Sequence, residues 1–251
     1  MMQMQEKIAV VTGVSHAYGI GAAACRRLAA DGCAVFFTYW EADTGWADLF
    51  QKEMLETGVR CASIELDLAE SDAPTKLLNA VEARLGLPSI LVNNAAFSTR
   101  DGYKKLDATM LDNHYAVNIR ATFLLSVEFA RRFEQAEGSS GRIINMTSGQ
   151  ALGPMLEELA YGATKAAISG FTLSLSAEVA PIGITVNAVN PGPTDTGWMT
   201  EDLHEELSAK FRMGRSGKPD DAARLISFLA SEEAEWITGQ VINSEGGFLR
   251  N

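Results

Sequence analysis

Short apolar runs alternate with longer amphipathic segments along almost the whole chain. Seven runs are typical of buried strands: Ile8–Val11, Val35–Phe37, Ala62–Leu66, Ile90–Val92, Arg142–Asn145, Ile184–Ala188 and Gln240–Ile242. Between them lie segments with helical patterning: 20–31, 44–57, 72–85, 107–134, 159–180 and 219–231. This alternation predicts one α/β domain over residues 1–251, a Rossmann-type doubly wound fold whose seven-stranded parallel sheet has helices on both faces.

The segment Gly192–Gly217 interrupts this alternation. It follows the end of a predicted strand and contains only a short helical run, 200–211. Open α/β sheets bind ligands at the carboxyl ends of their strands. We therefore expect residues 192–217 to form a substrate lid within the domain.

Charge and cysteine content narrow the class of protein. The formal net charge of −11 disfavours binding to nucleic acid or to an anionic membrane. Three cysteines without a CxxC spacing predict buried, reduced thiols rather than a metal site or disulfides. Met1–Lys7 lacks the pattern of a signal peptide, and no apolar run is long enough for a membrane span. We expect a cytoplasmic protein.

A glycine-rich turn, Thr12–Gly21, joins the first predicted strand to the first helix. Glycines there allow close approach of a pyrophosphate, and the helix N-terminus offers free amides and a positive dipole. An ordinary tight turn is the alternative interpretation. The residues expected to contact a dinucleotide in this turn are Gly13, Ser15, His16, Gly19, Ile20 and Gly21.

Two further strand ends should reach the same edge of the sheet. Asn93, Asn94 and Ala95 follow one strand, and Asp67 and Leu68 follow another. An Asp there can accept a hydrogen bond from the adenine amine, although a helix cap is an equal alternative. The asparagines can also be plain turn residues.

Ser148, Tyr161 and Lys165 form the sharpest chemical pattern. Tyr161 and Lys165 lie four residues apart on one predicted helix, so they share a face. An ammonium beside a phenol favours the phenolate and lowers its pKa, which suits a general acid near neutral pH. Ser148, at a strand end, can hydrogen-bond the same substrate oxygen.

Together these residues resemble the short-chain dehydrogenase/reductase family. The resemblance runs from about residue 7 to Gly247. Within the family, the chain is broadly similar to 3-oxoacyl-carrier-protein reductases. The motifs that carry it are Thr12-Gly13 with Gly19-Ile-Gly21, Asn93-Asn-Ala-Ala96, Asn118, Ser148, Tyr161-x-x-x-Lys165 and Pro191-Gly192.

The resemblance implies a role for each matching residue. Tyr161 would be the catalytic acid/base, Ser148 would orient the carbonyl, and Lys165 would lower the pKa of Tyr161 and bind the nicotinamide ribose. Asn118 would position a water that relays protons to Lys165. The residues expected beside the nicotinamide and diphosphate are Pro191, Gly192, Thr194 and Thr196.

This sequence departs from the family's motifs at two places, and the end of its second strand bears on the choice of cofactor. The glycine turn is longer than usual, with five residues, Val14–Tyr18, where the family has three, and Ala96 stands where the family has glycine. The second strand ends at Tyr39 without an acidic residue to repel a 2′-phosphate, which favours NADP. Glu41 lies nearby and no Arg or Lys does, which leaves Ser15 and His16 as phosphate partners, so NAD remains the alternative.

The resemblance therefore predicts an NAD(P)-dependent oxidoreductase, with the substrate left open. Ala177 stands where carrier-protein reductases often have Arg, so we expect a small free carbonyl or alcohol. Arg131 and Arg132 leave a carrier-bound acyl group as the alternative, and a dinucleotide-binding regulator without turnover is a second. Helices 107–134 and 159–180 carry apolar residues on more than one face, which with the resemblance predicts a homotetramer.

Overall fold

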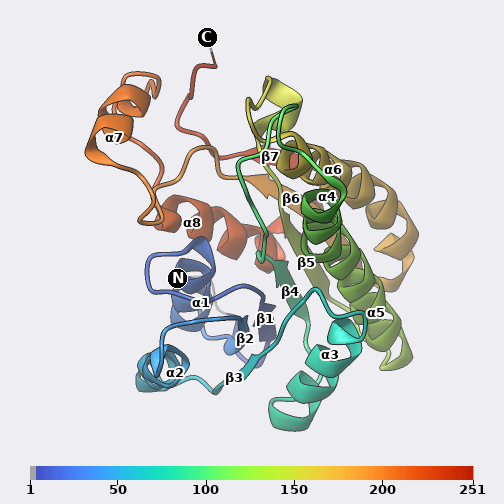
Figure 1. The fold of residues 1–251 in the computed structure, drawn as a ribbon. Helices are drawn as coiled ribbons and strands as arrows, with labels where there is room; N and C mark the ends of the chain where they lie inside the picture. The colour runs from blue at the N-terminus through green and yellow to red at the C-terminus, as the bar shows by residue number, and fades with distance from the viewer. Residues whose placement is uncertain (1–3, 251) are drawn as a thin grey trace.

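Seven parallel strands form the centre of the computed structural model, which describes residues 4–250 (Figure 1). Met1, at the start of the Met1–Lys7 segment, lies outside the described residues. The strands lie in the order β3-β2-β1-β4-β5-β6-β7, which reverses between β1 and β4, so a ligand-binding crevice is expected there. Their bounds are β1 (Ile8–Val11), β2 (Ala34–Tyr39), β3 (Cys61–Glu65), β4 (Ile90–Asn93), β5 (Gly141–Met146), β6 (Ile184–Asn190) and β7 (Val241–Asn243).

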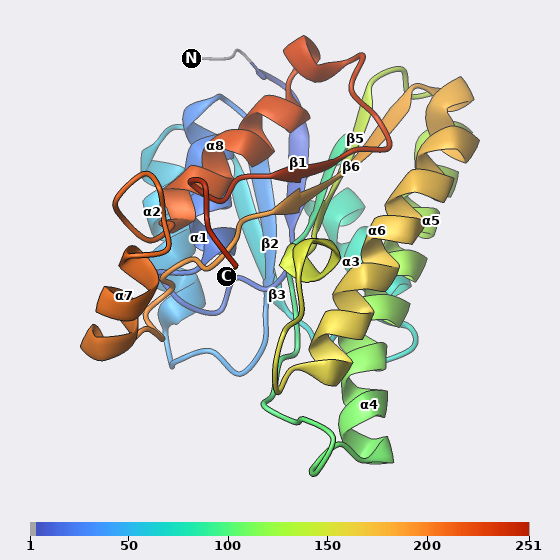
Figure 2. The same ribbon diagram turned by 90° about the horizontal axis from the view of Figure 1, so that it is seen from above.

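Helices cover both faces of the sheet, as predicted (Figures 1 and 2). One face carries α1 (Ile20–Ala30), α2 (Trp46–Glu56) and α8 (Pro219–Ala230), and the other carries α3 (Ala73–Arg84), α5 (Thr122–Gln135) and α6 (Leu159–Val179).

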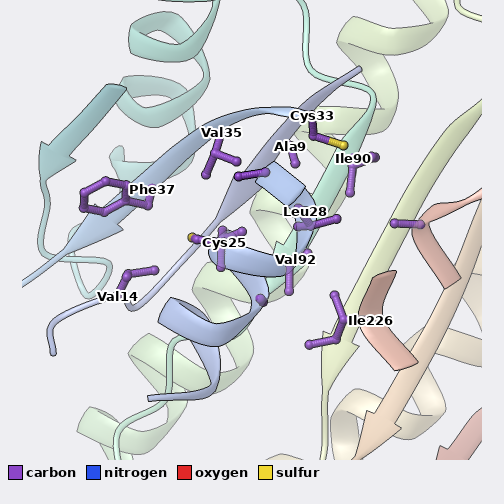
Figure 3. Close-up of a cluster of buried hydrophobic side chains, with 14 of the residues drawn as sticks. Ala9, Val14, Cys25, Leu28, Cys33, Val35, Phe37, Ile90, Val92 and Ile226 are labelled. Atoms are coloured by element: carbon purple, nitrogen blue, oxygen red, sulfur yellow. The ribbon is translucent and has the colours of Figure 1, made fainter. Parts of the chain in front are cut away.

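Successive strand residues point to opposite faces and so enter different cores. In β1, Ala9 and Val11 belong to the core beneath α1, whereas Ile8 and Val10 belong to the core on the other face. Figure 3 shows the first of these cores, where Cys25 and Leu28 of α1 lie against the strands. The two cores explain why the strands read as continuous apolar runs.

The helix predicted over 107–134 is not continuous. It consists of α4 (Ala108–His114), a π-helical segment (Tyr115–Ala121) and α5. The wider π-helical turn contains Asn118, whose buried side chain bonds to Phe97 and Thr164 outside the helix. Those bonds favour the irregular geometry, since π-helical turns are rare without a local reason.

The segment 192–217 contains one short helix, α7 (Glu201–Ser208), which is shorter than the predicted run 200–211. The Thr200 hydroxyl accepts a hydrogen bond from the Leu203 amide and so begins the helix. A bridge between Thr194 and Gly217 closes the base of the segment. Among the described residues, no helix is long and apolar enough to cross a membrane.

Candidate active site

A cavity of about 470 Å³ opens at the carboxyl ends of the central strands. It brings together the glycine turn after β1, the end of β2 and the helix α6, which are far apart in the sequence. The predicted residues that line it are Gly13, Ser15, His16, Gly19, Ile20, Gly21, Tyr39, Asp67, Leu68, Asn94, Ala95, Tyr161, Lys165, Pro191 and Thr196. One cavity therefore joins the expected dinucleotide contacts to the expected proton donor.

The glycine turn is shaped for close contact with a ligand. Gly13 has a φ of +72°, and a Cβ there would lie 2.6 Å from the Ala95 Cα. A Cβ on Gly21 would lie 2.6 Å from the Asn94 amide nitrogen. Helix α1 then begins at Ile20 with no side chain capping its amides. Those free amides and the helix dipole fit the diphosphate of a dinucleotide.

The longer turn, Val14–Tyr18, is held by side chains of α1 and α2. The indole of Trp46 donates to the Val14 carbonyl at 2.9 Å, and Arg26 donates to the Ala17 carbonyl at 2.8 Å. Arg26 is itself held by two hydrogen bonds to Glu53. The longer turn is thus a supported structure.

The two asparagines at the end of β4 have different roles. Asn94 faces the cavity, and its side chain donates to the carbonyls of Thr12 and Gly13, which ties the glycine turn to β4. Asn93 is 4% exposed and donates to Ser126 and Asn145. Asn93 is therefore placed in the core and not in the cavity, because neighbouring strand residues alternate between faces.

The end of β2 forms the part of the cavity expected to hold the adenosine ribose. Tyr39 and Trp40 line it beside Asp67. The Ser15 hydroxyl lies 3.1 Å from the Trp40 carbonyl and 3.2 Å from the Trp40 amide, and so fixes the turn against the strand. Asp67 and Leu68 lie beyond the end of β3, and an Asp67 oxygen accepts from the Ala69 amide.

Tyr161 and Lys165 meet at the inner wall of the cavity. The Lys165 Nζ donates to the Met146 carbonyl at 2.8 Å and lies 5.6 Å from the centre of the Tyr161 ring. Burial lowers the pKa of Lys165 to about 8. Burial, followed by the charge of Glu158, raises the pKa of Tyr161 to about 12. The expected lowering of the Tyr161 pKa by Lys165 is therefore absent, because burial dominates and the ammonium points to a carbonyl.

Ser148 follows β5, as predicted, but it does not line the cavity described above. Its hydroxyl lies 3.5 Å from the Met155 sulfur, a weak acceptor. The neighbouring Thr147 hydroxyl instead donates to the Lys165 carbonyl and joins β5 to α6. The Ser148 hydroxyl thus retains hydrogen-bonding capacity for a substrate oxygen.

Asn118 links the loop after β4 to α6 by hydrogen bonds. Its amide nitrogen donates to the Phe97 carbonyl and the Thr164 hydroxyl, and its oxygen accepts from the Phe97 amide. Thr164 in turn donates to the Tyr161 carbonyl. The structure places Asn118 behind the cavity, as a support for Phe97 and α6, and its expected water relay remains a prediction.

The segment after β6 contributes two of its four expected residues to the cavity. Pro191 and Thr196 line it, whereas Gly192 and Thr194 do not. Gly192 has a φ of +64° and lies against Glu245. The Thr194 hydroxyl donates to the carbonyls of Pro191 and Gly192, and so it holds the turn.

Sequence reasoning missed Asp101, which caps the catalytic helix. Its carboxylate accepts hydrogen bonds from the amides of Leu159 and Ala160 at 2.8 Å each, although Asp101 is distant in the sequence. Burial opposes ionisation of this carboxyl, but the amide donors and His114 outweigh it and lower the Asp101 pKa. No local capping pattern precedes α6, so only a contact between distant segments reveals the role.

Comparison with known proteins agrees with this site. The family model described as enoyl-(acyl carrier protein) reductase matches residues 13–249. The uncharacterized oxidoreductase YjdA of Bacillus subtilis is 60% identical over 250 residues and 100% of both chains. The 3-oxoacyl-[acyl-carrier-protein] reductase FabG of Aquifex aeolicus is 32% identical over 99% of both chains.

A solved structure gives the same answer for the fold. A blue fluorescent protein from a metagenomic library, determined in complex with NADPH, is 32% identical. It superposes with a TM-score of 0.89 over 98% of this chain and 99% of its own. The chain belongs to the short-chain dehydrogenase/reductase family of NAD(P)-dependent oxidoreductases.

Proposed function

We propose that this protein reduces a small free ketone with NADPH and that Tyr161 donates the proton. The observation that carries the proposal is the single cavity that Tyr161 and Lys165 share with the glycine turn. A carbonyl placed between Tyr161 and Ser148 would have two hydroxyl donors on its oxygen.

The side chains suit the reducing direction. The bound dinucleotide supplies the hydride. A raised pKa keeps Tyr161 protonated at neutral pH, so a proton is available for the alkoxide oxygen. Lys165, whose pKa is about 8, is mostly charged at pH 7 and can bind the ribose hydroxyls. Residues 192–217 form the substrate lid in this proposal.

NADPH is the proposed cofactor because β2 ends in Tyr39, where an acidic residue would repel the 2′-phosphate. The exposed Trp40 and His16 border the same part of the cavity. A relative with the same fold was determined with NADPH, which is consistent with this choice.

A carrier-bound acyl substrate is the alternative suggested by the relatives' names. Arg131 and Arg132 do not support it, because they lie near the C-terminal end of α5, shortly before β5 begins, and do not line the cavity at the strand ends. Arg132 is already paired with Glu128 and Glu82. We therefore favour the free carbonyl. Cytoplasmic location is also proposed, on the three buried free cysteines.

Turnover with a panel of diketones, oxoesters and a carrier-bound oxoacyl group tests the proposal. We expect NADPH oxidation with a free carbonyl, and loss of that activity in Tyr161→Phe with little change in NADPH affinity. Removal of one general acid costs roughly 10²–10⁴-fold in rate. Near-normal turnover in the variant would show that another group donates the proton. Binding without turnover on any substrate would favour the regulator.

A further inference from the structure

The end of the chain lies between the proposed lid and the loop that follows Ser148 (Figure 1). Three segments meet there: the tail (Gly246–Arg250), the catalytic loop (Ser148–Gly153) and the lid base (Lys210–Met213). In Figure 2 the end of the chain again lies between α7 and the short helix of the catalytic loop. Contacts on both sides of the tail show how it joins these segments.

The tail pairs with the lid base along its length. The Met213 amide donates to the Gly246 carbonyl at 3.1 Å, and the Leu249 amide donates to the Lys210 carbonyl at 2.9 Å. Phe211 and Phe248 form an antiparallel bridge between these bonds, with ring centroids 4.9 Å apart. Phe211 is 4% exposed, so this ring contact buries an apolar side chain between the tail and the lid base.

Arg250 connects the tail to the catalytic loop. Its side chain packs over Gly149 and Gly153, where a Cβ on Gly153 would lie 3.0 Å from the Arg250 Cδ and one on Gly149 would overlap the guanidinium. Gly149 begins the short helix that directly follows Ser148, and Gly153 follows its last residue. Arg250 therefore occupies space that a side chain on either glycine would fill.

Glu245 fixes the guanidinium and joins it to β6. Both carboxylate oxygens accept from Arg250, one of them at 3.0 Å. One oxygen also accepts from the Asn190 side chain at 2.6 Å, and Glu245 packs on Gly192. The Glu245 side chain is 8% exposed, and bidentate Arg–carboxylate pairs hold both direction and distance.

We propose that the Arg250–Glu245 pair is a latch that holds the lid base against the catalytic loop and so positions the substrate beside Ser148. This inference rests on the proposed function. Neither residue contacts reacting atoms, and both act through the segments that they join. The latch affects substrate binding more than proton transfer, because Tyr161 and Lys165 lie on α6, outside its contacts.

The test compares Arg250→Ala with Arg250→Lys, Arg250→Met and a control, Arg131→Ala, which removes an exposed arginine from α5. In Arg250→Ala we expect KM for the carbonyl to rise about fivefold, with kcat and NADPH affinity within about twofold of wild type. Arg250→Lys should recover part of the loss, because it keeps the charge. Arg250→Met keeps the stem without the charge and should not recover it. Arg131→Ala should leave KM unchanged.

Hydrogen–deuterium exchange gives a readout that does not depend on activity. Arg250→Ala should exchange faster over both 201–213 and 149–156, whereas Arg131→Ala should match wild type. Faster exchange in the tail alone, or full recovery by Arg250→Met, would overturn the latch. If the wild type reduced no carbonyl, the proposed function would fail, while the exchange measurement would still decide whether the latch exists.

Discussion

At the scale of single residues, burial sets the ionisation of the catalytic pair. The same enclosed wall raises the pKa of Tyr161 and lowers that of Lys165, since burial penalises whichever form is charged. Tyr161 therefore stays a phenol at neutral pH, while Lys165 approaches its titration point. The pair suits a proton donor beside a cation whose charge depends on pH.

Cofactor affinity should fall as the pH rises through about 8, where Lys165 loses its proton. In the wild type, the dissociation constant for NADPH, measured by fluorescence titration from pH 7 to 9, should increase above that point. Lys165→Met should bind more weakly at pH 7 and show no such change. A variant that retained the pH dependence would assign it to another group.

The same lowered pKa has a consequence for folding. The unfolded chain keeps an ordinary lysine, so it binds more protons than the folded chain above pH 8. The contribution of Lys165 to the free energy of unfolding therefore rises with pH in that range. Lys165→Met should lack this contribution, and thermal unfolding at pH 7 and 9 checks that the variant is folded.

Cofactor choice depends on the tip of β2. Tyr39→Asp should reverse the preference from NADPH to NADH, because a carboxylate there repels a 2′-phosphate and can bond the ribose hydroxyls. The measurement is the ratio of kcat/KM for the two cofactors. Tyr39→Phe keeps the size without adding charge and should leave the ratio unchanged. A wild-type preference for NADH would indicate that Glu41 or the longer glycine turn binds the adenosine ribose.

The sequence predicts residues that belong to a local pattern better than residues that act through contacts between distant segments. Gly13, Tyr161 and Lys165 were predictable, because a strand-to-helix turn and a four-residue helical spacing are local patterns. Asn93 was placed wrongly in the cavity, since strand register decides which of two adjacent asparagines faces it. Arg250 acts across segments that only the folded chain brings together.

At the scale of elements, the catalytic helix is held at its first turn by a residue from another loop. Asp101 supplies two amide contacts at the start of α6, close to Tyr161. Asn118 supplies a second support through Thr164. Asp101 lies in the loop after β4, and Asn118 bonds to the same loop at Phe97, so this loop positions the helix that carries the proposed proton donor.

Asp101→Asn should lower the free energy of unfolding at pH 7 by about 1–3 kcal/mol, because it weakens charged hydrogen bonds to buried amides. It should also reduce kcat, since α6 is less firmly placed. The folded pKa of Asp101 lies below the ordinary value of 3.8, so its contribution is present above that value and is lost as the pH falls through the folded pKa. The variant should therefore be less sensitive to acid, measured by thermal unfolding at several pH values.

Asp107→Asn is the matched control for this variant. Asp107 caps α4 by accepting from the Met110 amide at 2.8 Å, but α4 carries no proposed catalytic residue. It should cost some stability without a comparable loss of kcat. Equal losses of kcat in the two variants would mean that Asp101 has only a general structural role.

Element positions were predictable, and irregular geometry was not. Every strand, and every long helix except the broken one over 107–134, begins and ends within a few residues of its expected bounds, because apolar periodicity reports the buried face directly. The π-helical segment at Tyr115–Ala121 left no periodic signal, since it arises from Asn118 bonding outside the helix. The resemblance to the family, rather than the pattern, drew attention to that position.

At the scale of the whole molecule, α5 and α6 present an apolar surface that the rest of the described chain, residues 4–250, leaves exposed. Leu124 and Leu173 are 45% and 63% exposed, next to the stacked rings of Phe123 and Phe171. Near β7, Trp236 is 96% exposed. The α5–α6 surface and the exposed Trp236 are two separate places for a second copy to pack, and two kinds of two-fold contact would generate the predicted homotetramer.

Light scattering at micromolar concentration should give a mass about four times that of the 27.0 kDa chain. Leu173→Asp should reduce it to a dimer, because a carboxylate buried in the helix interface carries a large desolvation cost while the surface near β7 remains. Leu55→Asp, on α2, introduces the same change at a comparably exposed leucine and should leave the mass unchanged. A monomeric wild type would contradict the tetramer. An unchanged mass for Leu173→Asp would show that the subunits contact each other through surfaces other than α5 and α6.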